Sequence, residues 1–239
     1  MGRPAVSRWS PTGYRVAVSV ETEALVDERL RLGIIENPVR AVLHGTGAIT
    51  SVIGWVVLLM QRNHPALVVY GSTLVGMYSV STLYHAVPWG TVWKGRMQKL
   101  DHAFIYLLVA GTFTALVAGG MKGSSRLGAL VAIWALAALG IGREIRPTLR
   151  GRWVLVGQAS LGALALLAVV YLLRGIEGSE KVLTISGGVI YLGGLAMFVR
   201  SWPRLFPRVF GFHETFHVLV IAASVAHFLA VWQIWVSPS

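Results

Sequence analysis

Residues 213–236 read HETFHVLVIAASVAHFLAVWQIWV, a polar start that runs directly into a long apolar stretch. About 20 apolar residues in a helix cross the roughly 30 Å hydrocarbon core of a bilayer, so positions 218–236 predict a transmembrane helix. His213 and His217 stand four positions apart, which places both on one face of that helix where it enters the membrane. The stretch therefore predicts a membrane protein with a pair of histidines at the bilayer boundary.

The rest of the chain has the same apolar character. Of its 239 residues, 55% are hydrophobic and only 13% are charged, a balance that excludes an ordinary soluble domain. We predict an all-α membrane protein, in which residues 37–239 form a bundle of seven transmembrane helices and residues 1–36 form a short cytoplasmic segment. Within that segment, residues 21–32 could form an amphipathic helix or be disordered. The predicted spans are 39–60, 66–87, 103–121, 127–141, 153–173, 182–199 and 218–236, of which the fourth is short.

The distribution of basic residues predicts the orientation of the bundle. Lys and Arg collect in cytoplasmic loops. Of the 21, 16 lie before the first predicted span, at its edge (Arg40) or in every second loop after it. The amino terminus is therefore predicted to be cytoplasmic and the carboxyl terminus outside, which requires an odd number of spans. The formal net charge of +11 is explained by these loops, because the basic residues form no stripe with interleaved aromatics that would indicate a nucleic-acid partner.

Polar residues at the predicted cytoplasmic ends of the spans indicate a metal site. His85 ends the second span, Asp101 precedes the third, and His213 and His217 begin the seventh. Ser81 stands four positions before His85, on the same helix face. Three neutral imidazoles suit zinc and leave a fourth position for water, and a nearby carboxylate would orient a ligand or hold that water. The chain has no cysteine, so thiolate ligands are excluded.

The letters HETFH also match H-E-x-x-H, the helical zinc motif of metalloproteases, in which the Glu is the general base. The next histidine, His227, lies about 15 Å deeper along a continuous helix, so it cannot supply the third ligand of a soluble zinc protease. We predict that His227 is a buried, hydrogen-bonding histidine. Glu214 is expected to be an exposed neighbour of the first ligand and not a base.

Two further residues near the start of the first span have two readings. Glu36 and His44 could line the mouth of a cavity or receive the head group of a substrate, and for His44 the alternative of a purely structural role stays open. Asn37 is better explained as the helix N-cap, with Pro38 at the first helical position.

Four segments carry a family resemblance: ENPVRAVLHGTGA (36–48), STLYH (81–85), KLDHAFIYLLVAGTFTAL (99–116) and HETFHVLVIAASVAHF (213–228). In this order they resemble the hemolysin III family, bacterial relatives of the progestin and adipoQ receptors, over about residues 36–236. The resemblance implies a multi-pass protein of the bacterial plasma membrane with zinc held near the cytoplasmic face by His85, His213 and His217. It further implies that Ser81 and Asp101 lie beside the metal water.

The wider superfamily is similar to alkaline ceramidases, which hydrolyse a lipid amide. The resemblance thus implies a zinc-dependent hydrolase of a lipid amide or ester, with Asp101 as the proton acceptor, Ser81 as a hydrogen-bonding partner and a membrane lipid as substrate or ligand. The alternative is a receptor, signalling or lipid-homeostasis protein whose zinc is structural. A pore-forming cytolysin is disfavoured, because seven long apolar spans prevent a soluble state before insertion.

Overall fold

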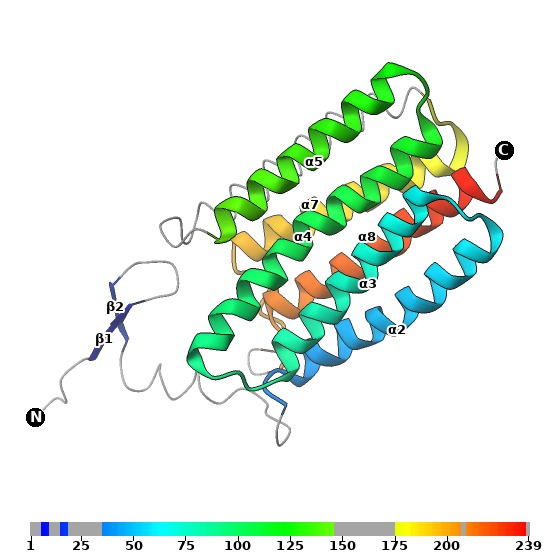
Figure 1. Cartoon of the computed structure of the whole chain (residues 1–239). Coiled ribbons are helices and arrows are strands. Elements are labelled where there is room, and N and C mark those ends of the chain that lie inside the picture. Colours follow the sequence, from blue (N-terminus) through cyan, green and yellow to red (C-terminus); the bar gives the residue numbers. More distant parts are fainter. Residues whose placement is uncertain (1–5, 10–14, 19–34, 146–174, 207–208, 238–239) are drawn as a thin grey trace, which may run out of the picture.

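The computed structural model describes residues 6–9, 15–18, 35–145, 175–206 and 209–237 (Figure 1). Within these ranges, six helices are long and apolar enough to cross a membrane. They correspond to six of the seven predicted spans, whereas the predicted span 153–173 lies outside the described residues. The six helices are α2 (Pro38–Gln61), α3 (Pro65–Ala86), α4 (Thr91–Gly120), α5 (Ser124–Ile145), α7 (Gly178–Val199) and α8 (Phe212–Trp235).

The helices pack in sequence order and then close back on themselves. Neighbours along the chain contact each other from α2 to α5, α7 packs on α8, and α8 returns to contact both α2 and α4 (Figure 1). This return of α8 brings the last helix of the chain against the first. Residues separated by more than 170 positions in the sequence can therefore meet at one end of the bundle.

Hydrogen bonds at the helix ends fix which termini lie together. The N–H of Asn37 donates to the carbonyl of His85 at 2.9 Å, which joins the start of α2 to the end of α3. Asn37 occupies the N-cap position and Pro38 follows it, as predicted, but the Asn37 side chain makes no capping bond. The carboxylate of Glu36 accepts from Lys94 Nζ at 2.8 Å, so the start of α4 lies at the same end.

Close approach between helices depends on small residues facing aromatic rings. A Cβ atom added at Gly47 of α2 would lie 2.7 Å from the ring of Tyr78 on α3, so only glycine fits against this ring. Tyr78 is almost fully buried, and its hydroxyl donates to Ser224 Oγ of α8 at 2.9 Å. This single side chain thus contacts both α2 and α8 and helps to fix the positions of α2, α3 and α8 relative to one another.

The N-terminal segment departs from the predicted all-α class. Residues Val6–Trp9 (β1) and Arg15–Val18 (β2) form a two-stranded antiparallel pair in which Val6 faces Val18 and Trp9 faces Arg15. Two of the four residues in each segment are valine or tryptophan, which favour extended backbone. The six described membrane-spanning segments are helical as predicted. Residues 21–32, predicted as an amphipathic helix or disorder, lie outside the described residues.

Candidate metal centre

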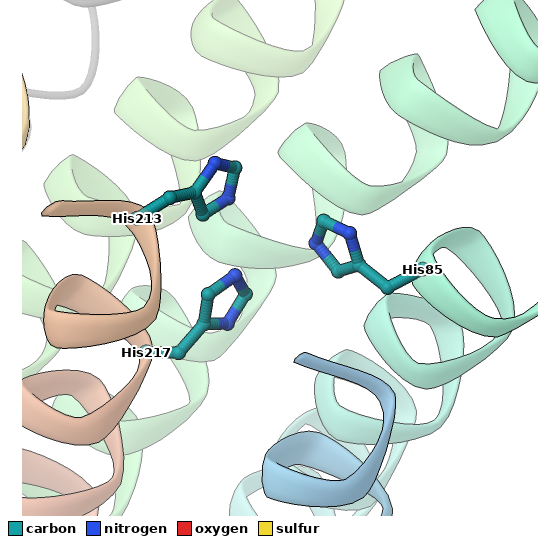
Figure 2. A group of neighbouring side chains, drawn as sticks. All are labelled: His85, His213 and His217. Atoms are coloured by element: carbon teal, nitrogen blue, oxygen red, sulfur yellow. The ribbon is translucent and has the colours of Figure 1, made fainter. Parts of the chain in front are cut away.

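Three histidines from two helices meet at one end of the bundle. His85 comes from the last turn of α3, and His213 and His217 come from the first turns of α8 (Figure 2). One ring nitrogen from each residue can be chosen so that all three lie within 4.8 Å of one another. The rings of His213 and His217 stack with centroids 4.8 Å apart, as the spacing of four along a helix requires.

The hydrogen-bonding of these rings fits a metal site. His85 and His217 are only 2% and 4% exposed, and the Nε2 atom of each has no hydrogen-bond partner within the described part of the chain. A buried polar atom without a partner is costly, and native structures rarely keep one. A cation bound by these two nitrogens and by His213 would satisfy both at once, so the donor set suits zinc with one position open.

Ser81 and Asp101 contact each other between α3 and α4. Ser81 lies one turn before His85 on α3 and is 1% exposed, and its side chain is hydrogen-bonded to the carboxylate of Asp101 on α4. The bond fixes the orientation of a carboxylate that is itself partly buried. The Asp101 carboxylate therefore lies beside the last turns of α3, where it is hydrogen-bonded to the hydroxyl of Ser81.

His44 lies deeper than a residue at the mouth of a cavity would. It is 3% exposed, and its Nε2 atom contacts Nδ1 of His217. Glu36 lies at the partly exposed helix ends, where its carboxylate is paired with Lys94.

Glu214 corrects the expectation of an exposed neighbour. The side chain is buried, and its Oε1 atom accepts from Arg40 Nε at 2.6 Å. The second oxygen, Oε2, accepts from the backbone N–H of Gly211 at 2.7 Å and so caps α8. Because both oxygens are engaged, Glu214 is not arranged as the general base of a metalloprotease, which supports the sequence-based argument against that reading.

His227 lies ten residues, nearly three helical turns, beyond His217 on α8. Its ring packs on Gly187 of α7, where an added Cβ would approach to 2.5 Å, and it is hydrogen-bonded to the backbone of Thr184. The prediction of a hydrogen-bonding histidine is confirmed, although the residue is half-buried and not fully buried among the described residues.

One pair near the site was missed by the sequence analysis. His102 Nδ1 lies 3.0 Å from Glu144 Oε1, which links α4 to the buried end of α5. The only signal in the sequence is that His102 directly follows Asp101 and that Glu144 lies in an otherwise apolar span. Neither fact indicates that the two residues are partners, because they are 42 positions apart.

Comparison with known proteins agrees with the architecture. The model of the family described as "Haemolysin-III related" matches residues 32–228. The chain is similar to a "Hemolysin-3 homolog" from Bacillus subtilis (strain 168), with 28% identity over 209 residues, which cover 83% of this chain and 93% of the relative. It is also similar to "Hemolysin-3" from Bacillus cereus, with 29% identity over 213 residues, which cover 85% and 93%.

The six apolar helices and these bacterial relatives identify a multi-pass bacterial membrane protein. The family match extends over most of the helical part of the chain, including all three histidines of the candidate metal centre. The resemblance noted in four sequence segments is thereby confirmed, and the chain belongs to the haemolysin-III related family.

Proposed function

We propose that this protein is a zinc-dependent hydrolase that cleaves an amide or ester bond of a membrane lipid. The observation that carries the proposal is the convergence of His85, His213 and His217, with two buried Nε2 atoms that lack partners among the described residues. Zinc bound there would supply Lewis-acid chemistry, polarising a carbonyl and lowering the pKa of water toward neutrality. Three neutral imidazoles are the donor set that suits this ion.

The surrounding residues supply the proton transfer that hydrolysis needs. Asp101 would accept a proton at its carboxylate, and Ser81 would donate a hydrogen bond that holds the carboxylate in one orientation. Ser81 could also donate to the oxygen on which negative charge develops as the carbonyl is attacked. Ser81 lies five residues before the end of α3 and Asp101 lies at the start of the apolar part of α4, so the substrate bond would be near the membrane boundary, where lipid amides and esters are found.

The proposal includes a seven-helix topology with the amino terminus in the cytoplasm. It is supported by the asymmetry of 16 basic residues against 5 and by the shared end at which α2, α3, α4 and α8 meet. The three histidines would then lie near the cytoplasmic face.

Single cysteines can test this topology cleanly, because the natural chain has none. Gly90, just before α4, and Ser124, the first residue of α5, are both exposed and lie beyond opposite ends of α4. A membrane-impermeant thiol reagent added to intact cells should label Ser124→Cys, whereas Gly90→Cys should be labelled only after the cells are opened. The reverse pattern would place the histidines on the outer side and contradict the proposed orientation.

The hydrolase is tested by removing and restoring the metal. Purified protein in vesicles that contain lipid amides and esters should release fatty acid, lose this activity on chelation and recover it with added zinc, as a metal-dependent reaction requires. Dye trapped in the same vesicles should stay inside, because the proposed activity opens no pore. Bound zinc without any lipid product would instead support a structural metal in a receptor or signalling protein.

A further inference from the structure

His44 is a buried histidine that the proposed reaction leaves without a role. It lies on α2, and its ring meets the ring of His217 on α8 with centroids 3.9 Å apart and planes 73° apart. The contacting atoms are Nε2 of His44 and Nδ1 of His217. In this edge-on arrangement a nitrogen of one ring, and not its face, is presented to a nitrogen of the other.

We infer that His44 is a positioning residue for the metal centre, which selects and fixes the nitrogen by which His217 binds the metal. This inference rests on the proposed metal site. A histidine ligand commonly donates its second ring N–H to another group, which fixes its tautomer and its orientation. In His217, Nδ1 is occupied by His44, and Nε2 is the buried nitrogen without a partner in the described part of the chain.

The tautomers follow from this assignment. If Nε2 of His217 binds the metal, Nδ1 carries the hydrogen and donates it to Nε2 of His44. His44 is then neutral, with its own hydrogen on Nδ1, a buried atom for which the described part of the chain supplies no acceptor. The usual acceptor for a metal-bound histidine is a carboxylate, a backbone carbonyl or water. A neutral imidazole performs the same function without placing an additional carboxylate charge at membrane depth, where ionised groups are costly.

The position of His44 is itself fixed by the helices around it. Its ring meets the ring of Tyr78 edge to face, with centroids 5.2 Å apart. Tyr78 is held in turn by its hydrogen bond to Ser224 and by its close packing on Gly47. Gly47 follows His44 on α2 by less than one turn. The same helix therefore supplies both His44 and the glycine against which Tyr78 packs.

The competing reading is that His44 is itself a metal ligand. The group of His85, His213 and His217 has ligand atoms within 4.8 Å of one another, and His44 is not a member of that group. Its Nε2 atom faces His217 and is therefore not free to face the same ion. The two readings predict different effects of glutamine, which can accept a hydrogen bond but binds zinc poorly.

The experiment uses the full chain in detergent or nanodiscs, with His44→Ala, His44→Gln and the control His227→Gln. Zinc affinity is measured by competition with a chromophoric chelator, and the site geometry is followed by the visible spectrum of bound Co²⁺. Wild-type protein and the control should bind one ion with the same affinity and spectrum. His44→Ala should bind about 10- to 100-fold more weakly with an altered Co²⁺ spectrum, and His44→Gln should recover most of the affinity.

The outcomes separate this inference from the proposal on which it rests. Wild-type metal binding with unchanged affinity and spectrum in His44→Ala would overturn the positioning role alone. A glutamine variant as weak as alanine, with a Co²⁺ spectrum that indicates one ligand fewer, would overturn it in favour of direct ligation. Absence of metal from the wild-type chain would overturn both the proposed function and this inference.

Discussion

Replacement of His217 by alanine is expected to reduce bound zinc from about one ion per chain to below about 0.1 after purification. His217 is the central member of the group, because its ring centroid lies 4.8 Å from that of His213 and 4.9 Å from that of His85. Its Nε2 atom is one of the two buried nitrogens without a partner among the described residues. The substitution leaves two imidazoles from different helices, which is too few to retain a tetrahedral ion against dilution.

The matched control is His227→Ala on the same helix. It removes a histidine of identical size that is hydrogen-bonded to the backbone of Thr184 and packs on α7, outside the group of three. Elemental analysis of both purified variants, with circular dichroism to verify helix content, makes the comparison. Full zinc in His217→Ala, or loss of zinc in the control, would show that the ligands have been assigned wrongly.

The zinc should also contribute to stability, because it would join α3 to α8. Among the described side chains, Tyr78 and Ser224 already connect these two helices by one hydrogen bond deeper in the bundle. The histidines would add a second connection at the helix ends. Chelation should accordingly lower the thermal unfolding temperature of the wild-type protein and leave that of His217→Ala unchanged.

The positions of the helices could be predicted from hydropathy more closely than their ends. The predicted span 66–87 agrees with α3 (Pro65–Ala86) to within one residue at each end. In contrast, α4 begins at Thr91, although its predicted span began at residue 103. The additional turns carry Lys94, Lys99 and Asp101, and a hydropathy count ends where such charges begin. A helix can continue past the hydrocarbon core as long as its backbone hydrogen bonds are made. Hydropathy therefore predicts the part of a helix that lies in the membrane and not the residues at which the helix begins and ends.

The candidate site was predictable where one helix sets the geometry. A spacing of four places His213 beside His217, and the side assigned to each loop places His85 at the same level. Pairings between helices were not predictable in this way. The contact between His44 and His217 depends on how far α2 and α8 are shifted along each other. That shift cannot be predicted from a single sequence.

The charges around the site explain why Glu214 was misjudged. A lone carboxylate between two ligands was expected to face solvent, because burial of a charge is costly. The cost is offset here by Arg40, which lies one turn before His44 on α2 and meets Glu214 within a buried ion pair. Since the partner is 174 positions away in the sequence, only the return of α8 onto α2 brings the two together.

A common arrangement emerges from these contacts. The residues with ionised partners lie at the helix ends, in the pairs Glu36 with Lys94 and Arg40 with Glu214. Further toward the middle of the bundle, the hydrogen-bonding side chains are the imidazoles of His44 and His217 and the hydroxyls of Tyr78 and Ser224. This order follows the rising cost of charge with depth. Asp101 differs from these ion pairs, because its carboxylate is hydrogen-bonded to the hydroxyl of Ser81, one turn before His85.

Substitution of Asp101 by asparagine is therefore expected to lower lipid hydrolysis by about 10²- to 10⁴-fold while the zinc content stays at the wild-type level. Asparagine has nearly the same shape and can still accept a hydrogen bond from Ser81 through its amide oxygen, so the packing between α3 and α4 is kept. What is lost is the ability to accept a proton from water. The measurement is fatty-acid release by purified protein in lipid vesicles, with zinc determined on the same samples.

Ser81→Ala separates proton transfer from the orientation of the carboxylate. It removes the hydroxyl bonded to Asp101 but keeps the carboxylate, so we expect a smaller loss of activity than in Asp101→Asn, again with full zinc. Unchanged hydrolysis in Asp101→Asn would exclude the proton-acceptor role. Loss of zinc together with activity would mean that Asp101 holds the metal site together, and the reaction would then need another base. The neighbouring His102 would be the first residue to test, because it follows Asp101 on α4 and is paired with the buried carboxylate of Glu144.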